Sequence, residues 1–379
     1  MTTEANSLTT ALQQLVKQAV ARHDGWLPFD RFMALALYAP GLGYYANESR
    51  KFGELPSSGS DFVTAPEMSP LFGQALAVQV ADALQATGTH EVWEFGAGSG
   101  ALAHQLLDAL GGSVRKYTIV ELSSSLRDRQ RAKLAGFGAK VQWVGELPER
   151  IEGVVVGNEV LDAMPVKLIA RIGGVWHERG VGLPQAQPER EEAVRPELVE
   201  GAFTWADRPT DLRPPLDIEG DHDYLTETHP QAEAFVRTLG DRLARGAAFF
   251  IDYGFGESEY YHPQRHMGTL MCHRGHMADG DPLIDVGLKD ITAHVDFTQL
   301  AVAAAEAGLE TLGYTTQGRF LINCGIVPLL ADAPLPSRIA GQRLIAEHEM
   351  GELFKVIAFY RGEFWDAAGF REGDRTHRL

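Results

Sequence analysis

The sequence of 379 residues contains only two cysteines, Cys272 and Cys324, too few for a disulfide framework. It has no apolar run long enough to cross a membrane as a helix, and it opens with no secretory or Arg-rich transit segment. Positive charge is also scarce, with 34 Lys and Arg against 51 Asp and Glu and a formal net charge of −17. This balance disfavours a nucleic-acid backbone as partner and suits a basic substrate better. We therefore expect a soluble cytoplasmic protein with no nucleic-acid partner and no membrane insertion.

The stretch VWEFGAGSGAL, residues 92–102, is the first candidate for a ligand site. An apolar strand leads into the run Gly96, Ala97, Gly98, Ser99 and Gly100, and the apolar-periodic segment after it predicts a helix. Glycine tolerates positive φ and has no Cβ, so a ligand can lie against the backbone. A helix N-terminus adds free N–H groups. A tight turn would also explain the glycines alone, but the full pattern favours a nucleotide-containing cofactor.

Two acidic residues bear on the identity of that cofactor. Glu94 would repel the pyrophosphate of a dinucleotide, whereas it can accept a hydrogen bond from the ammonium of a methionine moiety. Glu121 follows the predicted strand 117–120, about twenty residues past the glycines, where an acid binds ribose hydroxyls. Because both cofactors contain that ribose, Glu121 supports the βαβ unit without separating them. S-adenosylmethionine is favoured, and an NAD-dependent oxidoreductase stays open.

The segment DFVTAPEMSPLFG, residues 61–73, follows a Gly- and Ser-rich stretch, 46–60, that is predicted to be a mobile loop. Pro70 after Ser69 as N-cap predicts a helix to about residue 86. Glu67 lies in the turn before it. This turn has two interpretations. It only begins the helix, or it forms a lid that covers the cofactor.

The segment VVVGNEVLDAMPV, residues 154–166, begins with consecutive apolar residues that are typical of a parallel strand buried on both faces. Asn158, Glu159 and Asp162 follow at its carboxyl end, where ligands bind in open α/β sheets. A helix N-cap with acids in the first turn is the alternative explanation. The predicted strand 247–251 ends in a second polar cluster.

Changes in composition and in hydrophobic pattern along the sequence divide the chain into parts. Short strands joined at Gly173 and Gly174 predict an antiparallel insertion, which contains the charged, Pro-containing run 185–201, expected to be disordered. The predicted parts are an N-terminal helical cap with the lid loop (1–70), a first part of the core (71–166), the β insertion (167–222) and a second part of the core (223–379).

Residues 255–297 are predicted to form a long, irregular covering loop. It contains Cys272, His273 and His276, but no second paired cluster completes a zinc ligand set. We therefore predict no metal site.

Five motifs together resemble the MidA-like family of S-adenosylmethionine-dependent methyltransferases, relatives of the mitochondrial complex I assembly factor that methylates an arginine. They are EFGAGSGAL, GNEVLDAMPV, DFVTAPEMSPLFG, FIDYGF and DITAHVDF, and the resemblance spans about residues 29–360. It implies an α/β class I methyltransferase fold, a Rossmann-like sheet with the N-terminal helical cap and the antiparallel β insertion. The run 185–201 departs from the family pattern.

The resemblance also implies roles for residues. The three glycines Gly96, Gly98 and Gly100 would hold the methionine end, Glu121 the ribose, and Asn158 and Glu159 would face the methyl group. It implies an arginine side chain of a protein as the substrate.

An arginine guanidinium stays protonated, and a pair of carboxylates can hold it bidentately. Glu159 with Asp162 or Glu67 is our hypothesis for that catalytic pair. A cofactor-binding assembly factor without turnover and a small-molecule methyltransferase stay open as alternatives. A homodimer and a monomer are both compatible with the sequence.

Overall fold

The computed structural model describes residues 3–47, 63–184 and 202–379. Residues 48–60 of the predicted mobile loop and the run 185–201 lie outside the described residues. The chain forms two compact units, each discontinuous in sequence. Unit 1 comprises Met1–Glu48, Pro165–Pro230 and Tyr261–Ala293, and unit 2 comprises Ser49–Met164, Gln231–Tyr260 and His294–Leu379. The four-part division drawn from sequence texture stays a prediction.

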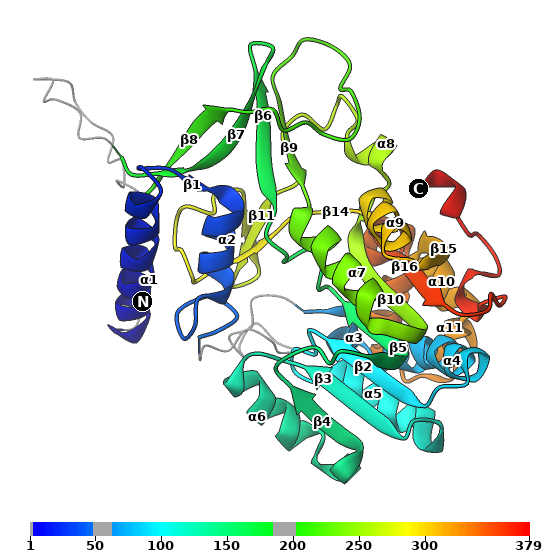
Figure 1. Ribbon diagram of the computed structural model, residues 1–379. Helices are drawn as coiled ribbons and strands as arrows, with labels where there is room; N and C mark the ends of the chain where they lie inside the picture. Colours follow the sequence, from blue (N-terminus) through cyan, green and yellow to red (C-terminus); the bar gives the residue numbers. More distant parts are fainter. Residues whose placement is uncertain (1–2, 48–62, 185–201) are drawn as a thin grey trace, which may run out of the picture. The chain divides into compact units, whose positions relative to one another are not determined.

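Unit 2 is built on an eight-stranded mixed sheet with the order β15-β16-β10-β5-β2-β3-β4, and β14 pairs with β10 (Figure 1). The strands β10, β5, β2, β3 and β4 run parallel, whereas β16 lies antiparallel to both β10 and β15. The sheet is therefore mixed rather than wholly parallel. The bounds are β2 Glu91–Phe95, β3 Lys116–Val120, β4 Val141–Val144, β5 Ile151–Asn158, β10 Leu243–Phe255, β14 Val295–Asp296, β15 Glu310–Thr316 and β16 Phe354–Arg361.

Helices cover both faces of this sheet. On β5, Val154 and Val156 pack into one core with α4, α5 and α10–α12, while Val155 packs into the other with α7 and α9. Burial on both faces explains why the β5 sequence is continuously apolar. The helices of unit 2 are α3 Ala65–Met68, α4 Pro70–Thr87, α5 Ala101–Leu110, α6 Ser124–Lys133, α7 Pro230–Arg242, α8 Glu257–Tyr260, α9 Phe297–Glu306, α10 Gln317–Asn323, α11 Ile326–Asp332 and α12 Leu335–Ile345.

The start of α4 follows the expected capping chemistry. Pro70 is the first helical residue, and the Ser69 hydroxyl accepts a hydrogen bond from the N–H of Leu71. Gly88 in the left-handed conformation ends the helix. The sequence therefore predicted both ends of α4 correctly to within one or two residues.

Unit 1 contains a five-stranded antiparallel sheet with the order β1-β7-β6-β9, in which β8 pairs with β7. The β6–β7 hairpin turns at Gly173 and Gly174, whose φ values of +55° and +83° favour glycine. The antiparallel insertion is thus confirmed. The elements are α1 Thr3–Arg22, β1 Leu27–Pro28, α2 Phe29–Tyr38, β6 Lys167–Ile172, β7 Val175–Gly182, β8 Thr204–Pro209 and β9 Tyr224–Thr228.

The prediction that residues 255–297 are irregular is wrong in part. A second sheet of unit 1 joins β11 (Met271–Arg274), β12 (Met277–Asp279) and β13 (Asp290–Thr292). These strands have only three or four residues each, so no alternation is long enough to reveal them. Cys272 is buried on β11, and burial raises the pKa of its thiol to about 12. No group of three or more His, Cys, Asp or Glu that could hold a metal occurs among the described residues.

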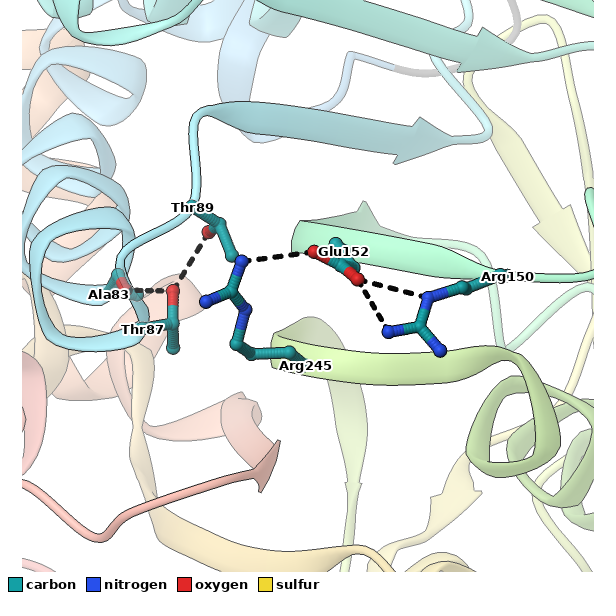
Figure 2. A network of polar contacts seen from close by, with 6 residues as sticks. All are labelled: Ala83, Thr87, Thr89, Arg150, Glu152 and Arg245. Atoms are coloured by element: carbon teal, nitrogen blue, oxygen red, sulfur yellow. Dashed lines mark hydrogen bonds and ion pairs between the residues drawn. The ribbon is translucent and has the colours of Figure 1, made fainter.

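The amino-terminal ends of β5 and β10 carry a network of polar contacts (Figure 2). Glu152 accepts hydrogen bonds from Arg150 at 2.6 Å and from Arg245 at 3.0 Å. Thr87 donates to the carbonyl of Ala83 close by. Hydrogen bonds from Arg150 and then Arg245 lower the pKa of Glu152. Exposed pairs of this kind contribute little to stability, and this network lies at the opposite end of β5 from Asn158.

In the parts of the chain that the structure describes, no helix combines the length and the apolar character needed to cross a membrane.

Candidate functional site

The glycine-rich loop lies between the end of β2 and the start of α5. Gly96, Gly98 and Gly100 have φ values of +63°, +50° and +79°. A Cβ added to Gly96 would lie 2.8 Å from Cγ2 of Val160. Both the backbone conformation and the close packing therefore require glycine at position 96. Ala97 is buried beside it.

Glu121 lies just beyond β3, and its carboxylate is fixed from two directions. The N–H of Ser123 donates to Oε1 at 2.8 Å, and Nε2 of Gln130 donates to Oε2 at 3.2 Å. The same Gln130 nitrogen donates to the carbonyl of Gly98 at 3.0 Å. Burial raises the pKa of Glu121, although these hydrogen bonds oppose the shift. Gln130 on α6 thus connects the predicted ribose acid to the glycine loop.

Glu94 is almost completely buried within the parallel strands. The hydroxyl of Tyr117 on the neighbouring strand donates to its Oε2 at 2.8 Å. Burial raises the pKa of Glu94 from 4.5 to about 8, and the Tyr117 hydrogen bond opposes the shift. A nearby cation would favour the ionised form. The proposed hydrogen bond from the cofactor ammonium to Glu94 stays a prediction.

Asn158 and Glu159 stand at the carboxyl end of β5, next to the end of β2. Nδ2 of Asn158 donates to Oε1 of Glu159 at 2.8 Å, and the N–H of Ala65 on α3 donates to the same oxygen at 3.4 Å. Glu159 has φ +53°, a left-handed conformation that costs a non-glycine residue about 1–2 kcal/mol. Such strain often occurs at functional sites. Contacts with neighbouring residues, rather than the backbone preference of glutamate, therefore stabilise this turn.

Asp162 lies in the same turn and pairs with a residue from β10. The hydroxyl of Tyr253 donates to Oδ2 of Asp162 at 2.5 Å. Burial raises the pKa of Asp162 to about 6, and the Tyr253 hydrogen bond opposes this shift. Asp252, the residue before Tyr253 on β10, is completely buried and accepts backbone hydrogen bonds from the turn after β5. The two polar clusters found in the sequence therefore meet beyond β5 and β10.

Comparisons with known proteins indicate which family this chain resembles. Residues 75–315 match a family model described as putative S-adenosyl-L-methionine-dependent methyltransferase. The crystal structure of a protein from Burkholderia thailandensis, described as a COG1565 superfamily member and likely methyl transferase bound to S-adenosyl-homocysteine, is 50% identical. It aligns with a TM-score of 0.92 and covers 100% of this chain and 99% of that one. The chain belongs to the MidA-like family of S-adenosylmethionine-dependent methyltransferases.

Curated relatives are more distant, but the matches cover most of this chain and most of each relative. A protein from Danio rerio named protein arginine methyltransferase NDUFAF7, mitochondrial, is 28% identical over 92% of this chain and 86% of its own length. The Caenorhabditis elegans homologue of that name is 27% identical over 80% of this chain and 74% of its own length. Both names say mitochondrial, which contradicts the cytoplasmic location expected from the sequence.

S-adenosylmethionine is therefore the cofactor of this methyltransferase, and the class I Rossmann-like fold is confirmed. The residues present fit it. Glycines leave room for a ligand along the loop. Oδ1 of Asn158 is buried and has no hydrogen-bond partner among the described residues, so it can accept from an ammonium group. We expect Gly96, Gly98 and Asn158 to hold the methionine end and Glu121 the ribose.

Glu67 lies on α3, the short helix whose first amide contacts Glu159. Gln105 on α5 links α3 to α4. Its Nε2 donates to the carbonyl of Pro66 on α3 at 2.7 Å, and its Oε1 accepts from the N–H of Gly73 on α4 at 3.0 Å. The structure thus brings the segment around Glu67 to the carboxyl end of β5. The catalytic roles of Glu67, Glu159 and Asp162 stay predictions.

A surface groove of about 860 Å³ lies elsewhere in unit 2, between α4, α5 and the α10–α11 junction. His104, Asp108, Asn323 and Leu329 are among its lining residues. It contains none of the residues predicted for the cofactor or for catalysis.

Sequence reasoning assigned no role to three residues of the site: Gln130, Asp252 and Tyr253. The cluster at the end of β10 was visible as polar residues after an apolar run, but its partners were not. Gln130 gave no signal at all, because a glutamine in a polar helix is ordinary.

Proposed function

We propose that this methyltransferase modifies an arginine side chain of a protein substrate. The names of the curated relatives support this substrate, and a basic acceptor suits the net charge of −17. The observation that carries the proposal is the pair of acidic residues Glu159 and Asp162 in one turn beyond β5.

The acceptor must be held by acidic side chains because the guanidinium is always protonated and its lone pair is delocalised. A carboxylate can bind two of its N–H groups and localise the charge on the nitrogens it contacts. Glu159 is suited to this role, since Asn158 and Ala65 fix its carboxylate. Glu67 is the second candidate for this contact.

Bound S-adenosylmethionine supplies an electrophilic methyl group on a sulfonium. As the N–CH₃ bond forms and the S–CH₃ bond breaks, the guanidinium loses one proton, which needs an acceptor. Asp162, with a pKa of about 6, is ionised in most molecules at neutral pH and can take that proton. Tyr253 fixes the orientation of the Asp162 carboxylate through its hydroxyl.

The test is the Glu159→Gln variant. Glutamine keeps the shape and the hydrogen bond from Ala65 but removes the negative charge, so we expect S-adenosyl-homocysteine affinity to change less than about threefold. Transfer should fall by about 100-fold or more, as for loss of a contact to a charged group in the transition state. The measurement is incorporation of labelled methyl groups into protein from cells that lack the enzyme, followed by hydrolysis and amino-acid analysis.

Glu152→Gln is the matched control, because Glu152 lies at the opposite end of β5 in the network of Figure 2. It should transfer methyl groups at the rate of the unchanged protein. The proposal is supported if labelled methylarginine forms with the unchanged protein and with Glu152→Gln, but not with Glu159→Gln. Label in another amino acid or in small molecules, or full activity of Glu159→Gln, contradicts it.

A further inference from the structure

One carboxylate of β10 accepts hydrogen bonds from three residues of the turn that follows β5. Oδ2 of Asp252 accepts hydrogen bonds from three successive backbone N–H groups, those of Val160 at 3.1 Å, Leu161 at 2.9 Å and Asp162 at 3.2 Å. Its Oδ1 accepts from the N–H of Tyr253 at 3.0 Å. Asp252 is completely buried, so no solvent competes for these contacts.

The register of the sheet explains how Asp252 reaches the turn. Ile251 of β10 lies opposite Asn158 of β5, and the carbonyl of Ile251 accepts the N–H of Glu159 at 2.9 Å. Asp252, one residue further on, therefore lies beside the first residues after β5. Its side chain continues the interaction between the two strands after β5 itself has ended.

The held turn faces the cofactor loop. Val160 packs so closely on Gly96 that a Cβ there would lie 2.8 Å from Cγ2. On the other side of the strained Glu159, Asn158 has a buried Oδ1 to which no residue in the described ranges donates a hydrogen bond. Moving the amides of the turn would move both Val160 and Asn158 relative to the glycines.

None of these contacts brings a cation to the carboxyl group of Asp252. Burial and then the neighbouring carboxylates of Asp162 and Glu159 raise the pKa of Asp252 well above its usual range. An apolar residue would avoid this electrostatic cost but could not accept the three N–H groups. Accepting these three N–H groups is therefore a role that an apolar residue at this position could not fill.

We propose that Asp252 is a positioning residue for the methionine end of the cofactor site. It acts by holding the turn Glu159–Asp162 against the glycine loop, so that Asn158 is preorganised before the cofactor arrives. The inference rests on cofactor binding and not on the identity of the methyl acceptor.

The test measures binding of S-adenosyl-homocysteine by calorimetry to the full chain. Asp252→Ala should weaken binding by about tenfold or more, because the three amides lose their common acceptor. Asp252→Asn keeps one acceptor oxygen and should recover most of that affinity. Asp82→Ala is the matched control: Oδ2 of Asp82 also accepts three hydrogen bonds, from Gln79, Trp365 and Ala368, but on α4 away from this turn.

A double-mutant cycle separates positioning from general destabilisation. If Asp252 acts through Asn158, the variant with both Asp252→Ala and Asn158→Ala should bind only slightly more weakly than the worse single variant. Multiplicative losses in the cycle, or equal losses for Asp252→Ala and Asp82→Ala, would overturn the proposal.

Hydrogen exchange of the unchanged protein keeps the proposal testable if Asp252→Ala does not fold. The amides of Val160, Leu161 and Asp162 should already exchange slowly without S-adenosyl-homocysteine, because their acceptor belongs to the protein. Exchange at the rate of an open chain until the ligand is added would contradict preorganisation by Asp252.

Discussion

Replacing Gln130 by Met should weaken cofactor binding, although Gln130 lies on a helix that carries no recognisable motif. The side chain is completely buried and makes three hydrogen bonds, to the carbonyl of Gly98, to Oε2 of Glu121 and from Nε1 of Trp143. Methionine has nearly the same volume but makes none of them. The variant therefore isolates the hydrogen bonds from the packing.

The size of the effect follows from these contacts. The substitution leaves the Gly98 carbonyl and the Trp143 N–H without this partner, and a buried polar group left unsatisfied costs about 1–3 kcal/mol. Both groups are only partly buried, so each should cost an amount in the lower part of that range. We expect the free energy of unfolding to fall by about 2–4 kcal/mol. Because Glu121 also loses the hydrogen bond from Gln130, S-adenosyl-homocysteine should bind about tenfold more weakly, which corresponds to about 1.4 kcal/mol.

Gln79→Met is the matched control for this experiment. Gln79 is also completely buried, donates to Asp82 at 3.2 Å and accepts from the N–H of Gly369 at 2.6 Å, on α4 away from the glycine loop. Both variants should have a lower Tm, measured by calorimetry, but only Gln130→Met should bind S-adenosyl-homocysteine more weakly. Unchanged affinity in a folded Gln130→Met protein would refute the role assigned to Gln130.

Two further predictions concern pH. Burial raises the pKa of Glu94 to about 8, so the folded protein binds more protons than the unfolded chain between pH 4.5 and pH 8. The stability that Glu94 contributes is therefore fully present below pH 4.5 and is lost as the pH rises toward 8. Glu94→Gln should therefore flatten the decline of Tm over this range, and an unchanged decline would contradict the shift. Asp162 has a pKa of about 6, which the Tyr253 hydrogen bond lowers, so transfer should rise with pH through that value. Tyr253→Phe should raise the pKa of Asp162 and move the rise to higher pH, whereas a rise that stays in place argues against Asp162 as proton acceptor.

Local sequence chemistry was enough to place most of the core elements. Ser69 and Pro70 marked the start of α4, the apolar run of β5 indicated a strand buried on both faces, and Gly173 with Gly174 indicated the β6–β7 turn. Each of these signals depends on neighbours within one turn or one strand. The strands β11, β12 and β13 were missed because they are too short for any periodic pattern.

The sequence by itself determined the glycine loop, the acids around it and hence the class of cofactor, because backbone conformation and charge at adjacent positions restrict what can bind there. Only the tertiary structure showed that Asp252 holds the turn after β5 and that Gln130 connects Gly98 with Glu121. Asp252 and Leu161 are 91 positions apart in the chain, and Gln130 and Gly98 are 32 positions apart. Sheet register and helix packing bring such residues together, and neither can be read from the sequence near any one of them.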